Sequence, residues 1–231
     1  FPVFPLPRPL DTVVTPSPLP SKSPFRILCF GRLSRYKTPG MFHILENAEA
    51  LQSAIPDFEV VILGGGGWRL VRFKMLAWRI NRRLGRSCVR VVGAQDDPRP
   101  WLKDACVVCG ASTSAIEAAL SLRPVVAFSS FWVGPITPEN LDEAVDCYFA
   151  ERSGRINLSK PEARAEILPA LFDIYKRYDQ ILPNLQEIQR RLHPLFNSDE
   201  TVRCFKALAR FLQEKKNCYE VPDAKGTACE T

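Results

Sequence analysis

The stretch Ala105–Phe128 constrains the fold of this chain most, because its pattern is that of a strand, a short loop, a helix and a second strand. The apolar run Ala105–Cys109 is typical of a strand that is buried on both faces of a sheet. A turn of small residues follows, and Ser114–Leu120 consists mostly of good helix formers. An Arg-Pro pair ends this helix, and Val125–Phe128 forms the next strand. Strands that alternate with helices in this way indicate a parallel sheet.

The same alternation extends through most of the chain. Further strands are expected at Phe25–Phe30, Phe58–Leu63 and Ser87–Val92, and helices at 38–55, 68–84 and 97–104. After Phe128 the pattern is less regular, with helices expected at 137–150, 161–178, 182–192 and 198–215 and an edge strand at 156–158. This order predicts an α/β fold: a doubly wound, Rossmann-like parallel sheet with additional C-terminal helices.

Composition divides the chain into four parts. Residues 1–24 contain eight of the twenty prolines and are expected to form an extended linker with little fixed structure. Residues 25–178 are predicted to form the Rossmann-like domain, 179–216 a set of C-terminal helices, and 217–231 a flexible tail. Because the chain begins with Phe and places a linker before the domain, we expect it to be a fragment of a longer protein.

Charge and composition restrict the location and the cofactors. The chain is 46% apolar and has a formal net charge of +6. No apolar run approaches the ~18 residues of a membrane-spanning helix, so a cytoplasmic location is expected, with the membrane surface as the alternative. The eight cysteines lack metal-binding spacing, and Cys106 and Cys109 are expected to be buried structural thiols. Asp97 is explained as a helix cap, so no metal ion is expected.

The predicted helix Trp68–Leu84 is basic and contains no acidic residue. Its apolar residues form two rows: Leu70, Phe73, Ala77, Ile80 and Leu84 in the first, and Trp68, Val71, Met75 and Trp78 in the second. A stripe of this width predicts packing against the sheet, with the arginines as the solvated face. The alternative is a basic amphipathic surface that contacts anionic lipid or nucleic acid.

Glu117 has two interpretations. In the first, Ser114 and Glu117 form a capping box at the start of their helix. In the second, the helix begins at the carboxyl end of a strand, where its N-terminus attracts anions and Glu117 accepts hydrogen bonds from the hydroxyls of a ligand. Residues 114–117 alone favour the capping box, whereas the neighbouring loops favour contact with a ligand. Both interpretations stay open.

Four glycines, Gly64–Gly67, follow the second strand. They do not form a dinucleotide-binding fingerprint, because Arg69 stands where the third glycine belongs. A loop of this composition still suits a sharp turn or the close approach of the backbone to a ligand.

Three loops thus follow strands in an order that resembles a known family. Arg32 and Lys37 come after the first strand, glycines after the second, and the helix that carries Glu117 after the fourth. Over residues 25–178 this arrangement resembles the C-terminal, donor-binding domain of GT-B-fold glycosyltransferases that use nucleotide-diphosphate sugars. The resemblance implies that Arg32 and Lys37 hold the donor diphosphate and that Glu117 accepts hydrogen bonds from the ribose hydroxyls.

The resemblance also implies the rest of the donor site and its ligand. The further residues expected to contact the nucleotide sugar are Gly65, Gly66, Gly93, Ser112 and Thr113. A nucleotide-diphosphate sugar is the implied donor substrate, with no additional cofactor and no nucleic-acid partner. Peripheral contact with a membrane is an additional expectation.

The family also has an N-terminal domain that binds the acceptor and usually supplies the catalytic base, and no part of this chain corresponds to it. His43 and His193 fall in or beside predicted helices, where a structural role is expected, so no catalytic residue is assigned. Cys109 stands where many retaining members carry the first of two glutamates, which leaves retention or inversion open. The predicted function is the donor-binding half of a glycosyltransferase, incomplete without that partner domain. The alternatives are a GT-B-fold epimerase domain and a non-enzymatic module whose basic helix binds lipid or nucleic acid.

Overall fold

The computed structural model of the chain describes residues 16–151, 156–158 and 160–219. The chain divides into two compact units, of which the larger comprises residues 13–193. The described part of the smaller unit, residues 194–219, contains the helix α10 (Ser198–Tyr219). Most of the predicted linker and most of the predicted tail lie outside the described residues, and residues 217–219 continue α10 instead of beginning a flexible tail.

A seven-stranded sheet forms the centre of the larger unit in the described part of the chain, in the order β3-β2-β1-β4-β5-β6-β7. Its strands are β1 (Phe25–Phe30), β2 (Phe58–Leu63), β3 (Val89–Gly93), β4 (Val107–Gly110), β5 (Val125–Phe128), β6 (Phe131–Pro135) and β7 (Ile156–Asn157). β1 pairs in parallel with β2 and β4, and parallel pairing continues to β3 on one side and β5 on the other. β6 and β7 are antiparallel additions beside β5. The predicted doubly wound α/β sheet is confirmed.

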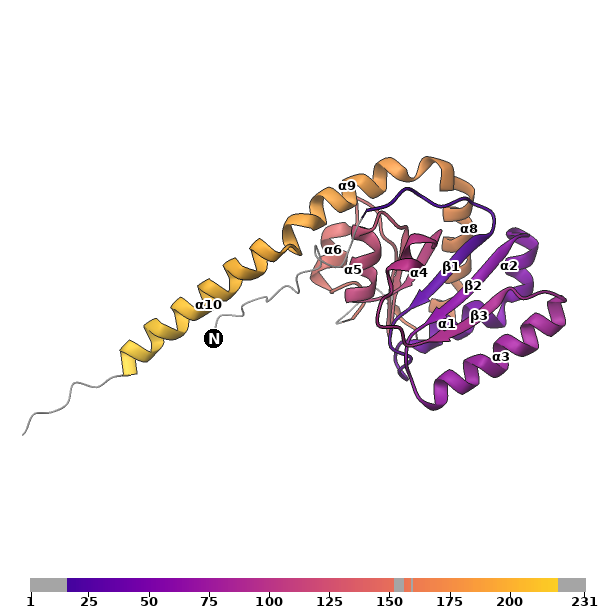
Figure 1. Ribbon diagram of the computed structural model, residues 1–231, viewed down its shortest axis with the longest axis horizontal. Coiled ribbons are helices and arrows are strands. Elements are labelled where there is room, and N and C mark those ends of the chain that lie inside the picture. Colours follow the sequence, from indigo (N-terminus) through magenta and orange to yellow (C-terminus); the bar gives the residue numbers. More distant parts are fainter. Residues whose placement is uncertain (1–15, 152–155, 159, 220–231) are drawn as a thin grey trace, which may run out of the picture. The chain divides into compact units, whose positions relative to one another are not determined.

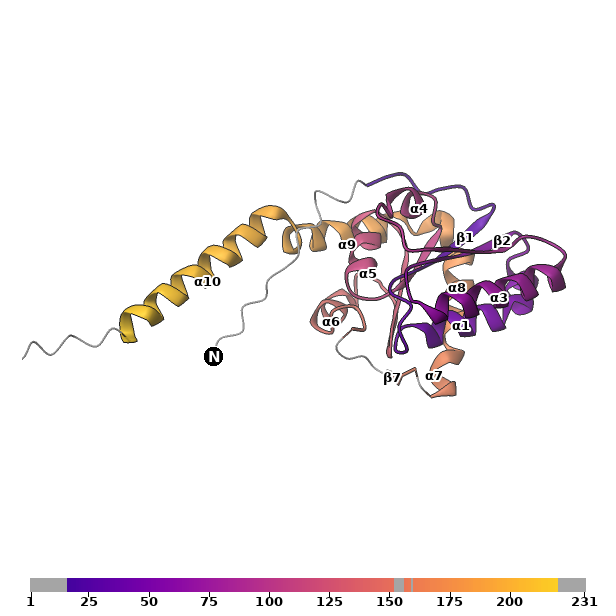
Figure 2. The same cartoon turned by 60° about the horizontal axis from the view of Figure 1, so that its bottom comes forward.

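Helices cover both faces of this sheet. They are α1 (Thr38–Glu46), α2 (Ala48–Ala54), α3 (Trp68–Leu84), α4 (Arg99–Lys103), α5 (Thr113–Leu120), α6 (Leu141–Asp146), α7 (Pro161–Ala165), α8 (Ile167–Arg177) and α9 (Leu182–Leu192). The strand order reverses at β1, so right-handed crossovers place α1 and α3 on one face and α4 and α5 on the other. Figures 1 and 2 show these two layers, with α8 beside α1 and α9 against α5. None of the described helices is long and apolar enough to cross a membrane.

Several predicted elements differ from the structure, and the single helix expected at 161–178 is divided into α7 and α8. The sequence does not reveal β6, and the helix expected at 137–150 is restricted to α6. The single helix expected at 38–55 is divided into α1 and α2 at Asn47. The Asn47 side-chain amide donates a hydrogen bond to the His43 carbonyl at 2.8 Å. The same carbonyl also accepts the helical bond from the Asn47 N–H at 3.2 Å, and the break appears in the backbone of Asn47, whose ψ is 29°.

The helix α3 packs on the sheet through one of its two apolar rows. Phe73, Ala77 and Ile80 are buried in the core. The Asn81 side chain ties the end of the helix to β3, because its oxygen accepts a hydrogen bond from the Val89 N–H and its amide donates to the Val89 carbonyl, both at 2.9 Å. The second apolar row is exposed. The prediction that both rows pack on the sheet is therefore wrong for the second.

Arg123, in the turn between α5 and β5, fixes the end of the Pro-rich segment against the domain. Its fully buried side chain donates hydrogen bonds to the carbonyls of Ser17 (3.1 Å), Pro18 (2.9 Å) and Leu102 (2.9 Å). Burial lowers the pKa of this guanidinium, and carbonyl oxygens satisfy its N–H groups. The expectation of little fixed structure in the linker is therefore wrong for its last part, from Ser17 onward.

Replacing Arg123 with Met should remove these hydrogen bonds while keeping most of the buried volume. Several carbonyl oxygens would then stay buried without donors, so the free energy of unfolding should fall by about 3 kcal/mol. Urea unfolding followed by circular dichroism measures this loss. Arg99→Met, which removes an exposed arginine of α4, is the matched control and should keep the parent midpoint. A parent-like midpoint for Arg123→Met would show that this side chain does not hold the segment.

Candidate functional site

The carboxyl ends of β1 and β4 meet at the point where the strand order reverses. After β1 the chain turns toward β2, and after β4 it turns toward β5, so the two loops leave in opposite directions. In open α/β sheets this divergence creates a crevice in which ligands bind. The predicted site residues Arg32 and Lys37 follow β1, Ser112 and Thr113 follow β4, and Glu117 lies in α5. The topology therefore brings both groups to one edge of the sheet.

Very close backbone contacts hold the strand ends together at this edge. A Cβ atom on Gly64 would lie 1.8 Å from the carbonyl oxygen of Gly31. A Cβ atom on Gly110 would lie 2.6 Å from the carbonyl oxygen of Phe30. Real Cβ atoms do not approach backbone atoms so closely, and only glycine fits at both positions.

The predicted site glycines connect neighbouring loops. The Gly65 carbonyl accepts a hydrogen bond from the Leu33 N–H at 2.8 Å, and the Gly93 carbonyl accepts one from the Gly64 N–H at 2.8 Å. A Cβ atom on Gly66 would lie 2.3 Å from that of Leu33. The close contact at Gly66 and the left-handed φ of 92° at Gly93 account for these two glycines without a ligand. Contact of Gly65, Gly66 and Gly93 with a nucleotide stays a prediction.

The two predicted cations have different surroundings. Arg32 is exposed, and its side chain forms no ion pair or hydrogen bond within the described residues. Lys37, the residue that precedes α1, forms an ion pair with Glu151, with 2.6 Å between its Nζ and the carboxylate Oε2. An anion that binds Lys37 must therefore displace Glu151 or share the ammonium group with it.

The start of α5 differs from a capping box. Ser112, the residue before the helix, has a φ of 59° and a ψ of −138°, which is uncommon for a residue with a Cβ atom. The Ser114 hydroxyl shares its one proton between the carbonyls of Phe30 (3.0 Å) and Ala111 (2.8 Å). The capping-box interpretation is therefore wrong at Ser114. Glu117 lies one turn further along the helix and is only 6% exposed.

A segment that sequence reasoning does not single out completes this edge. Tyr148, Phe149 and Ala150 have left-handed φ values of 52°, 51° and 67°. The Phe149 carbonyl accepts a hydrogen bond from the Ser112 N–H at 3.2 Å, and Glu151 follows directly. Strain of this kind costs about 1 to 3 kcal/mol per residue and clusters at functional sites. The segment contains no Gly or Asn, the usual residues of left-handed backbone, so its sequence gives no signal.

The two cysteines of the Cys-x-x-Cys pair are structural. Cys106 and Cys109 are both free and buried, which confirms the prediction for this pair. Cys109 is paired with Cys29 across β4 and β1, and burial, with the neighbouring thiol, raises the pKa of Cys109. Among the described residues, no group of three or more potential metal-ligating side chains is found.

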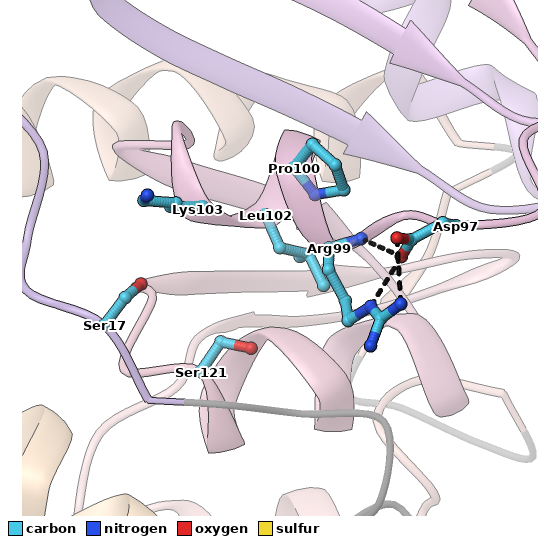
Figure 3. Close-up of a pocket in the computed structure, with 7 residues that line it drawn as sticks. All are labelled: Ser17, Asp97, Arg99, Pro100, Leu102, Lys103 and Ser121. Atoms are coloured by element: carbon cyan, nitrogen blue, oxygen red, sulfur yellow. Dashed lines mark hydrogen bonds and ion pairs between the residues drawn. The ribbon is translucent and has the colours of Figure 1, made fainter.

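A separate cavity of about 480 Å³ lies beside α4, the end of α5 and the Pro-rich segment (Figure 3). Its lining residues are Ser17, Asp97, Arg99, Pro100, Leu102, Lys103 and Ser121. Arg99 points toward Asp97, with 2.7 Å between its Nε and the carboxylate Oδ1, and these hydrogen bonds lower the pKa of Asp97. None of the predicted site residues lines this cavity. The candidate site is therefore the edge formed by the ends of β1 and β4.

Residues 24–153 match the family model described as "Glycosyl transferases group 1". The chain belongs to this family. The matched residues include β1 to α6, and with them Arg32, Lys37 and Glu117. The resemblance to the C-terminal domain of GT-B glycosyltransferases is thereby confirmed. No curated protein matches the chain.

Solved glycosyltransferase structures share the fold. HepE from Anabaena, solved with UDP and glucose, is 20% identical, with a TM-score of 0.56 over 82% of this chain and 48% of its own. A variant of TarM from S. aureus, solved with Fondaparinux, alpha-GlcNAc-glycerol and UDP, is 17% identical, with a TM-score of 0.57 over 85% of this chain and 37% of its own. A glycosyltransferase from Rickettsia africae is 16% identical, with a TM-score of 0.51 over 86% of this chain and 49% of its own. The chain thus spans about half the length of HepE and less than half the length of TarM.

The close approach of Gly64 to the Gly31 carbonyl predicts that Gly64→Ala strongly destabilises the domain. Its Cβ atom would clash with backbone and its φ of 152° is unfavourable for alanine, so the free energy of unfolding should fall by about 3 kcal/mol. Gly67→Ala is the matched control, because its Cβ would meet no atom within 4 Å and only its φ of 50° is unfavourable. This control should lose about 1 kcal/mol. Equal losses in urea unfolding would contradict the close contact.

Proposed function

We propose that this chain is the donor-binding half of a glycosyltransferase that uses a nucleotide-diphosphate sugar. The observation that carries the proposal is the meeting of a basic loop, a helix N-terminus and a buried carboxylate where the strand order reverses. Membership of the glycosyl transferase group 1 family supports sugar transfer. The presence of UDP in the HepE and TarM structures supports a nucleotide as part of the donor.

The donor diphosphate is proposed to lie between the loop after β1 and the start of α5. The first N–H groups of a helix lack intrahelical acceptors, and the helix dipole adds partial positive charge there. Arg32 supplies a planar set of donors suited to phosphate oxygens, and Lys37 supplies a point charge. Ser112 and Thr113 stand at the helix start. The strained backbone of Ser112 supports this placement, because strain clusters at binding sites.

The ribose of the nucleotide is proposed to bind Glu117. An ionised carboxylate only accepts hydrogen bonds, and a ribose offers two hydroxyl donors. Ser114 donates to backbone carbonyls and does not cap the helix, so the capping box expected from the sequence is absent at Ser114. Its low exposure would strengthen a charge-assisted bond to a ligand. The glycines Gly65, Gly66 and Gly93 would let the backbone approach the nucleotide sugar.

Sugar transfer is proposed to need a second, acceptor-binding domain. The share of HepE and TarM that this chain covers, 48% and 37%, supports this requirement. His43 lies in the last turn of α1, where its carbonyl accepts from Asn47, and His193 directly follows α9. We assign neither histidine as the catalytic base. The chain alone is expected to bind the donor without transferring its sugar.

Calorimetric titration with UDP, GDP and ADP tests the donor site. At least one nucleotide should bind, and at about 100 times its dissociation constant it should stabilise the chain by about 2.7 kcal/mol. Glu117→Gln should weaken binding ten- to a hundredfold, because a charge-assisted hydrogen bond contributes roughly 1.5 to 3 kcal/mol. A nucleotide that lacks both ribose hydroxyls is the control and should bind the parent chain and the variant alike.

Two outcomes would contradict separate parts of the proposal. If none of the three nucleotides gives binding heat or a thermal shift at millimolar concentration, the donor site is rejected. If the parent chain and Glu117→Gln bind the same nucleotide equally well, the donor site stands and Glu117 has no role at the ribose.

The ion pair between Lys37 and Glu151 predicts a variant that binds more tightly. Glu151→Gln removes a negative charge from the proposed diphosphate site and frees the Lys37 ammonium group. Because a partly exposed ion pair contributes up to about 1 kcal/mol, nucleotide affinity should rise about two- to fivefold. Glu187→Gln is the control, because Glu187 pairs with Arg190 on α9, and its affinity should equal that of the parent. Weaker binding by Glu151→Gln would instead mean that the carboxylate contacts the ligand.

A further inference from the structure

One side of α3 carries apolar side chains that no described part of the chain covers. Trp68, Val71, Met75 and Trp78 are 72%, 42%, 50% and 61% exposed. Their spacing of three, four and three residues places them in one row along the helix. Single exposed apolar residues are common on protein surfaces, but a contiguous row indicates an interaction surface.

This row lies opposite the side of α3 that packs on the sheet. Phe73, Ala77 and Ile80 are almost completely buried in the core. At about 100° per residue, these three positions point away from Met75 and its neighbours in the exposed row. Figures 1 and 2 show α3 running beside β3. The outer side of the helix faces away from the sheet. Among the described residues, packing of the domain therefore leaves the exposed row uncovered.

Basic side chains border the row. The 17 residues of α3 include six basic residues and no acidic one. Lys74 and Arg79 are exposed, and within the described residues neither forms an ion pair. The Arg82 guanidinium lies 5.5 Å from the centroid of the Trp78 ring. The surface thus combines a continuous apolar row with an uncompensated positive border.

We propose that this surface docks on a bilayer that contains anionic lipids. The α3 face is defined as Trp68, Val71, Met75 and Trp78 together with Arg72, Lys74, Arg79 and Arg82. The apolar row would enter the boundary between headgroups and acyl chains, where tryptophan rings are favoured. The arginines and the lysine would meet the negative potential of the lipid surface. The helix, about 25 Å long, would lie in the plane of the surface.

A bilayer fits this face better than a nucleic acid does. A phosphate backbone would pair with the cations but would leave Val71 and Met75 in water. A lipid surface buries the apolar row and neutralises its border at the same time. The α3 face uses none of the proposed donor-site residues, so the inference does not depend on the proposed function.

Co-sedimentation of the whole 231-residue chain with vesicles at physiological salt tests the proposal. We expect retention on vesicles of phosphatidylcholine mixed with phosphatidylglycerol and much less on phosphatidylcholine alone. Tryptophan emission should shift to shorter wavelength and be quenched by brominated acyl chains, because Trp68 and Trp78 are exposed whereas Trp101 is half-buried and Trp132 is buried. This quenching is measured on the parent chain and requires no variant to fold.

Two variants separate the apolar row from its basic border. Trp68→Ser combined with Trp78→Ser should lower the partition coefficient about tenfold or more, because two large apolar groups no longer enter the lipid. The partition coefficient should fall about a hundredfold in the triple variant Lys74→Gln, Arg79→Gln and Arg82→Gln, because three positive charges no longer meet the anionic surface.

Matched controls remove similar groups from other helices. Val202→Ser, Phe205→Ser and Leu212→Ser remove side chains of α10 that are 50%, 54% and 57% exposed. Lys176→Gln, Arg177→Gln and Arg190→Gln remove the same number of exposed positive charges from α8 and α9. Both control variants should bind vesicles like the parent chain.

Four outcomes would overturn the proposal. The first is equal retention on neutral and anionic vesicles, and the second is parent-like retention of both α3 variants. The third is binding of duplex DNA at the same salt without retention on vesicles, which assigns the face to nucleic acid. The fourth is self-association without vesicle binding that Trp68→Ser with Trp78→Ser abolishes, which assigns the face to a second copy of the chain.

Discussion

The close approach of three strand ends is the constraint on which the rest of this structure depends. β2, β1 and β4 end side by side, and glycine at positions 64 and 110 lets neighbouring backbones meet where no Cβ atom fits. The Ser114 hydroxyl adds a hydrogen bond from α5 to the Phe30 carbonyl at 3.0 Å. The loops diverge directly at these strand ends, so backbone geometry determines where the candidate site lies. The side chains of the site extend from this fixed backbone.

The opposite, amino-terminal edge of the sheet is fixed by donors that suit a proline-rich segment. Proline lacks an N–H group, so such a segment offers mainly carbonyl oxygens. Side chains of the domain donate hydrogen bonds to these oxygens. Arg123 donates to the carbonyls of Ser17 and Pro18, and the Tyr178 hydroxyl donates to the Pro20 carbonyl at 3.2 Å. Burial raises the pKa of Tyr178, so its hydroxyl keeps the proton that this bond needs.

Local patterns predict the parts of the fold that local chemistry decides. β1, β2, β5, α3 and α9 have their predicted bounds, because apolar periodicity and Gly or Pro signals mark their ends. The order of loops along the chain is also enough to find the family. Periodicity finds both apolar rows of α3 but not which row the sheet covers. The ion pair of Lys37 with Glu151 joins distant segments, and the turn of Ser114 toward Phe30 needs the neighbouring strand, so neither has a local signal.

Burial and partners, rather than the net charge of +6, distinguish the roles of four described arginines. Arg26 links β1 to β2 through Glu59, with 2.8 Å between Nε and the carboxylate, and Arg123 is buried among carbonyls. Arg32 at the proposed donor site and Arg79 on α3 are exposed instead, and neither side chain has an ion-pair partner in the described part of the chain. Both proposed ligands, a nucleotide and a lipid, carry phosphate, so the cation alone does not distinguish them. The distinction comes from the neighbouring groups: a helix N-terminus and a carboxylate suit a nucleotide, whereas a row of exposed apolar side chains suits a bilayer.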